Sequence, residues 1–269
     1  MRARAIVAAM VAAVLVPSAA RQSEIAPSRG WELAPAVTSA LIVAGVTLPN
    51  RILHRDHIVR RHKWRPWPTR LFALLRLCDP IACYALLRRR TMNSRDYLFL
   101  CMSAMGALRH WLWATKINLN DWTWELAVTV AAFNFWFDWT HAQNLLRRPR
   151  PLNAVACAGA ACFVAGTAIE SVSELQRAAF KRRTAPRSRL YTRGLFRFAT
   201  NINYLGYILW RAGIGLVSAP PHTLAYALYH AVDFRLRAIP LLHAHMHAKY
   251  GEEWSEYAAR TRRLIPFLL

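Results

Sequence analysis

The chain has 269 residues, of which 55% are hydrophobic and 12% aromatic, and its 36 basic and 14 acidic residues give a formal charge of +22. A charge of this size favours nucleic-acid binding when it lies on a groove-reading motif. Here Arg and Lys stand in short groups between long apolar blocks, as in the loops that flank membrane helices. No groove-reading motif is recognisable. We therefore expect a membrane protein with no nucleic-acid partner.

Residues 1–20 have a basic start, a short apolar core and small residues near their end, which is typical of a signal peptide. A retained first helix and an organellar presequence fit the same pattern. We predict that residues 1–30 form a signal peptide, a signal anchor or a presequence. We expect residues 31–130 to form N-terminal transmembrane helices.

Apolar blocks of membrane-spanning length recur along the rest of the chain, each near the ~20 residues that a bilayer requires. They cover residues 33–50, 71–87, 97–115, 123–140, 152–169, 202–218 and 222–243. The fold class predicted is all-α: a polytopic transmembrane helical bundle of about six to eight spans, with a C-terminal amphipathic helix over a cofactor cavity.

Several of these blocks contain polar residues that a single-pass anchor has no reason to keep. The second is interrupted by Asp79-Pro80, the third contains Arg109, and the fourth contains Asn134 and Asp138. Intramembrane polar residues mark functional sites by default. Asn134 and Asp138 are one helical turn apart, and a hydrogen bond between helices explains them equally well.

The five cysteines lie inside apolar blocks and show neither CxxC nor Cys/His spacing. They are Cys78, Cys83, Cys101, Cys157 and Cys162. We expect them to be small buried hydrophobic residues and predict no metal site or disulfide framework.

Two acids and two cations share one face at the end of the 152–169 block. Glu170 and Glu174 are spaced i, i+4, and Arg177 and Lys181 continue the same face. A solvated helix end with ordinary ion pairs explains this pattern. The alternative is a pocket rim, where the carboxylates lie at the membrane boundary and the cations hold a phosphate-bearing cofactor.

The stretch "NINYLG" places an amide and a phenol, those of Asn203 and Tyr204, where the next apolar block starts. Gly206 follows and would let a planar group approach the backbone. Anchoring at the membrane interface accounts for Tyr204, but it does not account for the two asparagines, Asn201 and Asn203.

The last block repeats aromatic residues on one helix face: Tyr250, Trp254 and Tyr257 are spaced i, i+4 and i+7. Just before them, His243, His245 and His247 alternate. Only His243 and His247 would share a face of a helix, and two histidines without an acid are a weak ligand set. We therefore expect no metal.

Together, the order of these blocks over roughly residues 130–269 resembles the C-terminal domain of the steroid 5-alpha-reductase-like membrane proteins. This superfamily includes the sterol C14- and C7-reductases, and the isoprenylcysteine and phospholipid methyltransferases are related to it in architecture. The similarity is greatest to the branch known only as a domain of unknown function. The resemblance implies that residues 131–269 form a steroid-reductase-like membrane domain.

The resemblance also implies residue roles. The family pattern Q-K-x-x-F-R matches Gln176, Arg177, Phe180 and Lys181, whose cations would hold the phosphates of NADPH. The cofactor-binding residues implied are Glu174, Gln176, Arg177, Lys181, Asn203, Tyr204, Lys249, Tyr250, Trp254 and Tyr257. The motif K-Y-G-x-x-W-x-x-Y is intact, whereas Thr200, Asn201, Tyr207, Leu242 and His243 depart from the family's Arg-His and acidic positions.

The function implied is an integral membrane oxidoreductase that reduces a carbon–carbon double bond of a lipid or sterol-like substrate with NAD(P)H. Glu170, Tyr204 and Tyr250 are the candidate proton donors. A eukaryotic source would imply the endoplasmic reticulum. Two alternatives stay open: an S-adenosylmethionine-dependent membrane methyltransferase, and a degenerate member that binds lipid without catalysis.

Overall fold

The computed structural model describes residues 66–118, 122–184, 189–218, 220 and 222–268. Within these ranges the chain is helical and contains no strand, which confirms the all-α class. The predictions for residues 1–30 and for the span at 33–50 lie outside the described residues.

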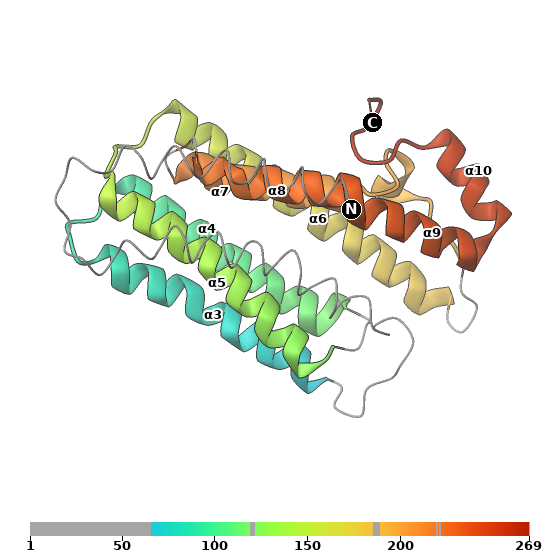
Figure 1. The fold of residues 1–269 in the computed structure, drawn as a ribbon, viewed down its shortest axis with the longest axis horizontal. Helices are drawn as coiled ribbons and strands as arrows, with labels where there is room; N and C mark the ends of the chain where they lie inside the picture. Colours follow the sequence, from blue (N-terminus) through green and yellow to red (C-terminus); the bar gives the residue numbers. More distant parts are fainter. Residues whose placement is uncertain (1–65, 119–121, 185–188, 219, 221, 269) are drawn as a thin grey trace.

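Each remaining apolar block coincides with one or more helices. The elements are α3 (Trp67–Leu87), α4 (Ser94–Leu112) with the π-helical turn η1 (Trp113–Ile117), α5 (Trp124–Arg147), α6 (Ala154–Thr184), the 3-10 turn η2 (Gly194–Arg197), α7 (Ile202–Val217), η3 (His222–Leu224), α8 (Ala225–Asp233), the π-helical turn η4 (Phe234–Ala238), α9 (Ile239–Tyr250) and α10 (Glu252–Arg260). Figure 1 shows α3, α4 and α5 side by side in one group and α6, α7 and α8 in a second; α9 continues the line of α8, and α10 follows beyond α9.

Helix α3 runs without a break through Asp79-Pro80, which the sequence predicts as an interruption. Proline inside a helix removes one backbone hydrogen bond. Packing compensates for this loss, because Cys83, Leu86 and Leu87 are buried in the main apolar core on the turns that follow.

Helices α6 and α7 pack backbone to backbone. A Cβ atom built on Gly206 would lie 2.6 Å from the backbone nitrogen of Glu170 and 2.8 Å from the carbonyl oxygen of Gly166. Only glycine permits this approach. The space that the sequence assigns to a planar ligand group at Gly206 is therefore filled by α6, and the contact fixes the Glu170 turn against the start of α7.

The bundle exposes apolar side chains and buries charged ones. Along α3, for example, Leu74 and Ile81 are 60% and 68% exposed, whereas Arg76 and Asp79 are 1% exposed. Among the described helices, α6 alone is long and apolar enough by composition to cross a membrane. These features indicate membrane association, and the count of six to eight spans stays a prediction.

Candidate functional site

Glu170 is held by two neighbours at the centre of the bundle. Its carboxylate pairs with Nη1 of Arg109 at 3.0 Å and accepts a hydrogen bond from Nε1 of Trp210 at 2.8 Å. The Arg109 and Glu170 side chains are only 9% and 12% exposed, so Glu170 does not lie on a solvated helix end. Both carboxylate oxygens have partners, and its proposed role as a proton donor stays a prediction.

Glu174, one turn later on α6, joins two other predicted residues. Nη2 of Arg177 lies 2.5 and 2.6 Å from its two oxygens, and Nδ2 of Asn203 donates to Oε1 at 2.9 Å. The Asn203 contact crosses from α7 to α6. The two sequence blocks that the prediction brings together therefore do meet, with the carboxylate of Glu174 at their junction.

Two lysines lie around this junction. Lys181 is within electrostatic range of Arg177 and Lys249, as well as of Glu174, and both lysines are exposed. We call Glu174, Arg177, Lys181, Asn203, Tyr204 and Lys249 the rim cluster. In this cluster the acid and the amide are buried and the cations lie nearer the surface. The cations can bind an anionic group of a ligand, and the buried acid and amide can hydrogen-bond to its hydroxyl groups.

Tyr204 is the member of the rim cluster that contacts η4. Its ring stacks on that of Phe234 with a centroid separation of 4.4 Å and an interplanar angle of 22°. Glu174, Arg177, Asp233 and Arg237 all act electrostatically on its phenol. Tyr204 is therefore within electrostatic range of two ion pairs.

Gln176 serves the fold in this structure. Its Oε1 accepts a hydrogen bond from the backbone N–H of Leu195 at 3.0 Å. Gly194, with a φ of 61°, lies directly beside the same side chain. The contact ties the 194–197 turn to α6, and a cofactor role for Gln176 stays a prediction.

The terminal aromatic residues do not share one helix, contrary to the sequence-based expectation. Gly251 adopts a φ of 54° and separates α9, which ends at Tyr250, from α10, which carries Trp254 and Tyr257. The spacing is helical, but glycine admits a left-handed backbone that ends α9 there. The three aromatic side chains still gather in one apolar cluster around Leu190.

These aromatic residues hold the segment that joins α6 to α7. Tyr257 donates to the carbonyl of Phe196 at 2.6 Å, and the hydroxyl of Tyr250 lies 3.5 Å from the carbonyl of Arg189. Burial raises the pKa of the Tyr257 phenol, so this group stays a donor. Tyr250 thus contacts the segment that joins α6 to α7. Glu170 on α6 instead contacts α7, and Asn203 on α7 contacts α6.

The departures from the family pattern have identifiable places. Thr200 and Asn201 bind the carbonyl of Arg263 and fix the C-terminal segment beside the start of α7. His243 packs against the ring of Trp254 at 5.4 Å, and Leu242 beside it is half-buried. Within the described ranges, no three metal-binding side chains lie together, so no metal group is seen there.

The interior contains a charged network whose members no local sequence pattern joins. Arg76 on α3 pairs with Asp79 and with Asp138, 3.5 Å away, and its Nε donates to Nδ1 of His110 at 3.1 Å. Ser103 donates to Asp138 at 2.8 Å. We call these five residues the core charge network. The hydrogen bond from Ser103 on α4 to Asp138 on α5 is thus a bond between helices, as the structural explanation of this polar pair predicts.

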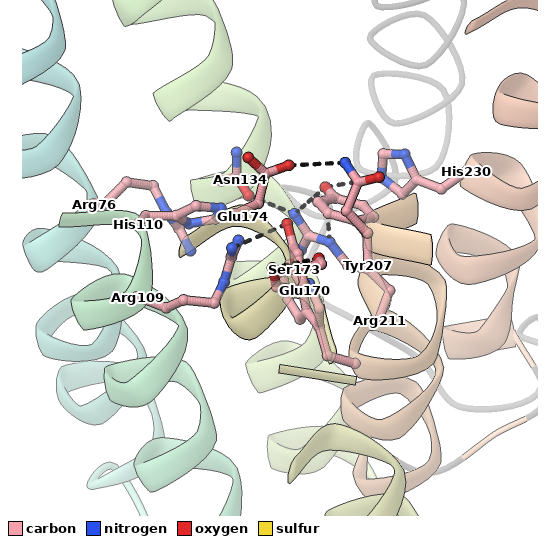
Figure 2. Close-up of polar contacts among 12 residues, drawn as sticks. Arg76, Arg109, His110, Asn134, Glu170, Ser173, Glu174, Tyr207, Arg211 and His230 are labelled. Atoms are coloured by element: carbon pink, nitrogen blue, oxygen red, sulfur yellow. Dashed lines mark hydrogen bonds and ion pairs between the residues drawn. The ribbon is translucent and has the colours of Figure 1, made fainter. Parts of the chain in front are cut away.

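A second buried group lies on α7. Nε and Nη2 of Arg211 donate to the hydroxyl of Tyr207 at 3.1 and 2.9 Å, and Nη2 also contacts Oδ1 of Asn134. Nε2 of His230 on α8 is 3.5 Å from the same hydroxyl. Figure 2 shows these side chains meeting those of Arg109, Glu170 and Glu174 between the helix groups. Arginine inside apolar blocks is the signal that could have found them.

A cavity of about 480 Å³ lies between the ends of α3, α4 and α5. Its walls are almost wholly apolar, and Trp67, Trp111 and Trp124 form part of its lining together with Arg70. None of the predicted site residues lines it, so it is separate from the rim cluster.

The family model described as "Protein of unknown function (DUF1295)" matches residues 83–261, two thirds of the chain. The protein therefore belongs to this family, as the resemblance to a domain of unknown function predicted, whereas membership of the steroid 5-alpha-reductase-like superfamily stays a prediction. The chain is also similar to a protein of Ustilaginoidea virens named "Probable O-methyltransferase ustE", with 27% identity over 157 residues. That alignment covers 54% of this chain and 55% of the relative, so the chain spans about half the length of the curated relative it matches.

Proposed function

We propose that the protein is a membrane-associated methyltransferase that uses S-adenosylmethionine to methylate an oxygen atom of a lipophilic small molecule. The O-methyltransferase name of the relative supports the reaction class. The apolar outer faces of α3 and α4 support a lipophilic acceptor, because such a substrate reaches an enzyme from the bilayer.

The main support for this proposal is the buried carboxylate of Glu174, which lies near the stacked rings of Tyr204 and Phe234. A carboxylate and the faces of aromatic rings both stabilise a permanent cation, such as a sulfonium. Arg177 is suited to the carboxylate of the methionyl part, and the Asn203 amide to ribose hydroxyls. The residues present therefore fit this cofactor.

When bound, S-adenosylmethionine supplies an electrophilic methyl group. The chain's own part is to bind and orient: Glu174 offers a negative charge, and Asn203 fixes the carboxylate of Glu174 against α7. Glu174 is 7% exposed, so its charge acts in a region that excludes most water. The Arg109–Glu170 pair behind it holds α4 against α6 and keeps the two helices in register.

The test is thermal unfolding of the purified full-length protein in detergent, with and without S-adenosylmethionine. A ligand of the native state raises its stability, by about 2.7 kcal/mol at a hundredfold excess over Kd. We expect stabilisation of the wild type and loss of most of it in Glu174→Gln. Glu253→Gln is the matched control, since Glu253 is an exposed acid on α10. Equal stabilisation of both variants would remove Glu174 from the site.

A second function is favoured by the cations of the rim cluster. Lys181 and Lys249 lie at the surface near Arg177, an arrangement that suits phosphate groups. It supports an NAD(P)H-dependent reductase of a carbon–carbon double bond in a lipid or sterol-like substrate. Stabilisation by NADPH that is lost in the double variant Lys181→Gln, Lys249→Gln would favour this reductase, whereas a response to neither cofactor would favour a non-catalytic lipid-binding protein.

A further inference from the structure

Arg211 is buried in the bundle without an acidic partner in the part of the chain that the structure describes. Arg95 is also 1% exposed and has no acid within ion-pair distance among the described residues, but all three of its guanidinium nitrogens donate to backbone carbonyls. Arg76 pairs with Asp79 and Asp138, and Arg109 pairs with Glu170. Arg211 is 1% exposed, and within the described ranges no carboxylate lies within ion-pair distance of it. Its Nη1 is buried without a hydrogen-bond partner there.

The surroundings of Arg211 do not replace a counter-ion. Its guanidinium lies over the rings of Trp210, Phe137 and Tyr207 at 4.1, 4.9 and 5.2 Å. Cation–π contacts of this kind contribute much less than the cost of burying an unpaired charge. The neutral groups Tyr207 and Asn134 take the hydrogen bonds of Nε and Nη2.

None of the other titratable groups that the structure describes near Arg211 offers a free negative charge. Arg76 and His110 lie within electrostatic range of Arg211, as does His230, which faces it from α8. Glu170 on α6 is also within range, but its oxygens bind Arg109 and Trp210. An anionic oxygen is therefore the group that this environment lacks.

The position of Arg211 links it to the rim cluster. Asn203, Tyr207 and Arg211 follow one another at intervals of four residues, so they share one face of α7. At 1.5 Å per residue this polar stripe runs about 12 Å inward from the Asn203–Glu174 contact. A cofactor at the rim and an acceptor group at Arg211 would then lie along the same face.

We propose that Arg211, together with Tyr207, is the binding site for a carboxylate of the acceptor substrate, which is accordingly a lipophilic monocarboxylic acid. The inference rests on the proposed function. A carboxylate carries the single charge needed to neutralise Arg211, and it accepts from a guanidinium in favourable planar geometry. The free Nη1 donates to one of its oxygens, and the hydroxyl of Tyr207 has a proton to donate to it as well.

The first test compares the stability of two methionine variants of the full-length protein without ligand. If Arg211 binds the substrate, its charge is unpaired and destabilising in the protein without substrate. Arg211→Met should therefore raise the apparent melting temperature by roughly 2 °C or more. Arg109→Met is the matched control, and it should lower that temperature because Glu170 is left buried and unpaired. A comparable fall in both variants would show that Arg211 is structural and would overturn the proposal.

The second test uses octanoate and 1-octanol as probes of equal chain length. Octanoate should raise the melting temperature of the wild type more than octanol does, and Arg211→Met should abolish the difference. No preference for octanoate in the wild type, or the same preference in the variant, overturns the carboxylate assignment. Binding of S-adenosylmethionine is measured alongside, and its absence would count against the proposed function while leaving the Arg211 result intact.

Discussion

The core charge network and the rim cluster both pair acids with bases, yet they are built differently. In the network, Arg76, Asp138 and His110 come from three helices and are almost fully buried. In the rim cluster, Glu174 and Arg177 are three residues apart on one helix, and the Arg177 side chain is 32% exposed.

Acid–base pairing thus serves two purposes in this molecule. Ion pairs that cross helices in a dry interior fix the arrangement of those helices, and removing one partner leaves a costly unpaired charge. The pair in the rim cluster lies within one helix, and its cation is partly exposed while its acid is buried. Arg177 can therefore turn toward a ligand at smaller cost than a cation of the network, which suits the rim cluster for binding.

The largest effect is expected from Arg76→Met, because it leaves both Asp79 and Asp138 buried without a cation. We expect the free energy of unfolding to fall by about 3–5 kcal/mol, measured by denaturant unfolding in detergent. Arg70→Met on the exposed side of α3 is the control and should cost about 0.5 kcal/mol or less. Similar losses in the two variants would contradict the distinction between network and surface.

A smaller effect is expected from Tyr257→Phe, which removes the hydrogen bond to the buried carbonyl of Phe196. Leaving a buried acceptor unsatisfied costs about 1–3 kcal/mol. The same substitution at Tyr84, which is 49% exposed, should be nearly neutral. A neutral Tyr257→Phe would mean that α10 is held by apolar packing alone.

The same tyrosine predicts a pH dependence. Burial raises the pKa of Tyr257 above its ordinary value of about 10, so the protonated phenol is favoured in the folded state. Its contribution is fully present below pH about 10 and is lost as the pH rises through the folded-state pKa. Stability of the wild type should thus fall faster in alkali than that of Tyr257→Phe, and parallel curves would contradict the burial of this proton.

The sequence predicted the helices well, because an apolar block of about 20 residues indicates a helix regardless of which other helices pack against it. The family resemblance assigned Glu174 and Asn203 to one cofactor site, and their side chains do meet, although their role in cofactor binding stays a prediction. Spacing within one helix was enough to place Arg177 next to Glu174.

The remaining parts of the site depend on contacts that spacing does not encode. Asn134 and Arg211 are 77 residues apart and lie in different apolar blocks, so no local pattern joins them. The break between Tyr250 and Trp254 was missed because their spacing is helical and only the φ of Gly251 separates them. The packing of α6 against Gly206 likewise depends on which helix lies opposite.

The smallest effect is expected from Asp233→Asn, which tests the local kind of ion pair at a second place. Asp233 and Arg237 are spaced i, i+4 near Tyr204, and their side chains are 14% and 31% exposed. Such pairs contribute about 0.3–0.5 kcal/mol, and salt screens them. We expect a loss of this size in low salt that vanishes at 1 M salt, where the Debye length is about 3 Å. A loss of several kcal/mol that persists in salt would mean that this pair behaves like those of the core charge network. The region of buried, costly ion pairs would then extend past Tyr204 to η4.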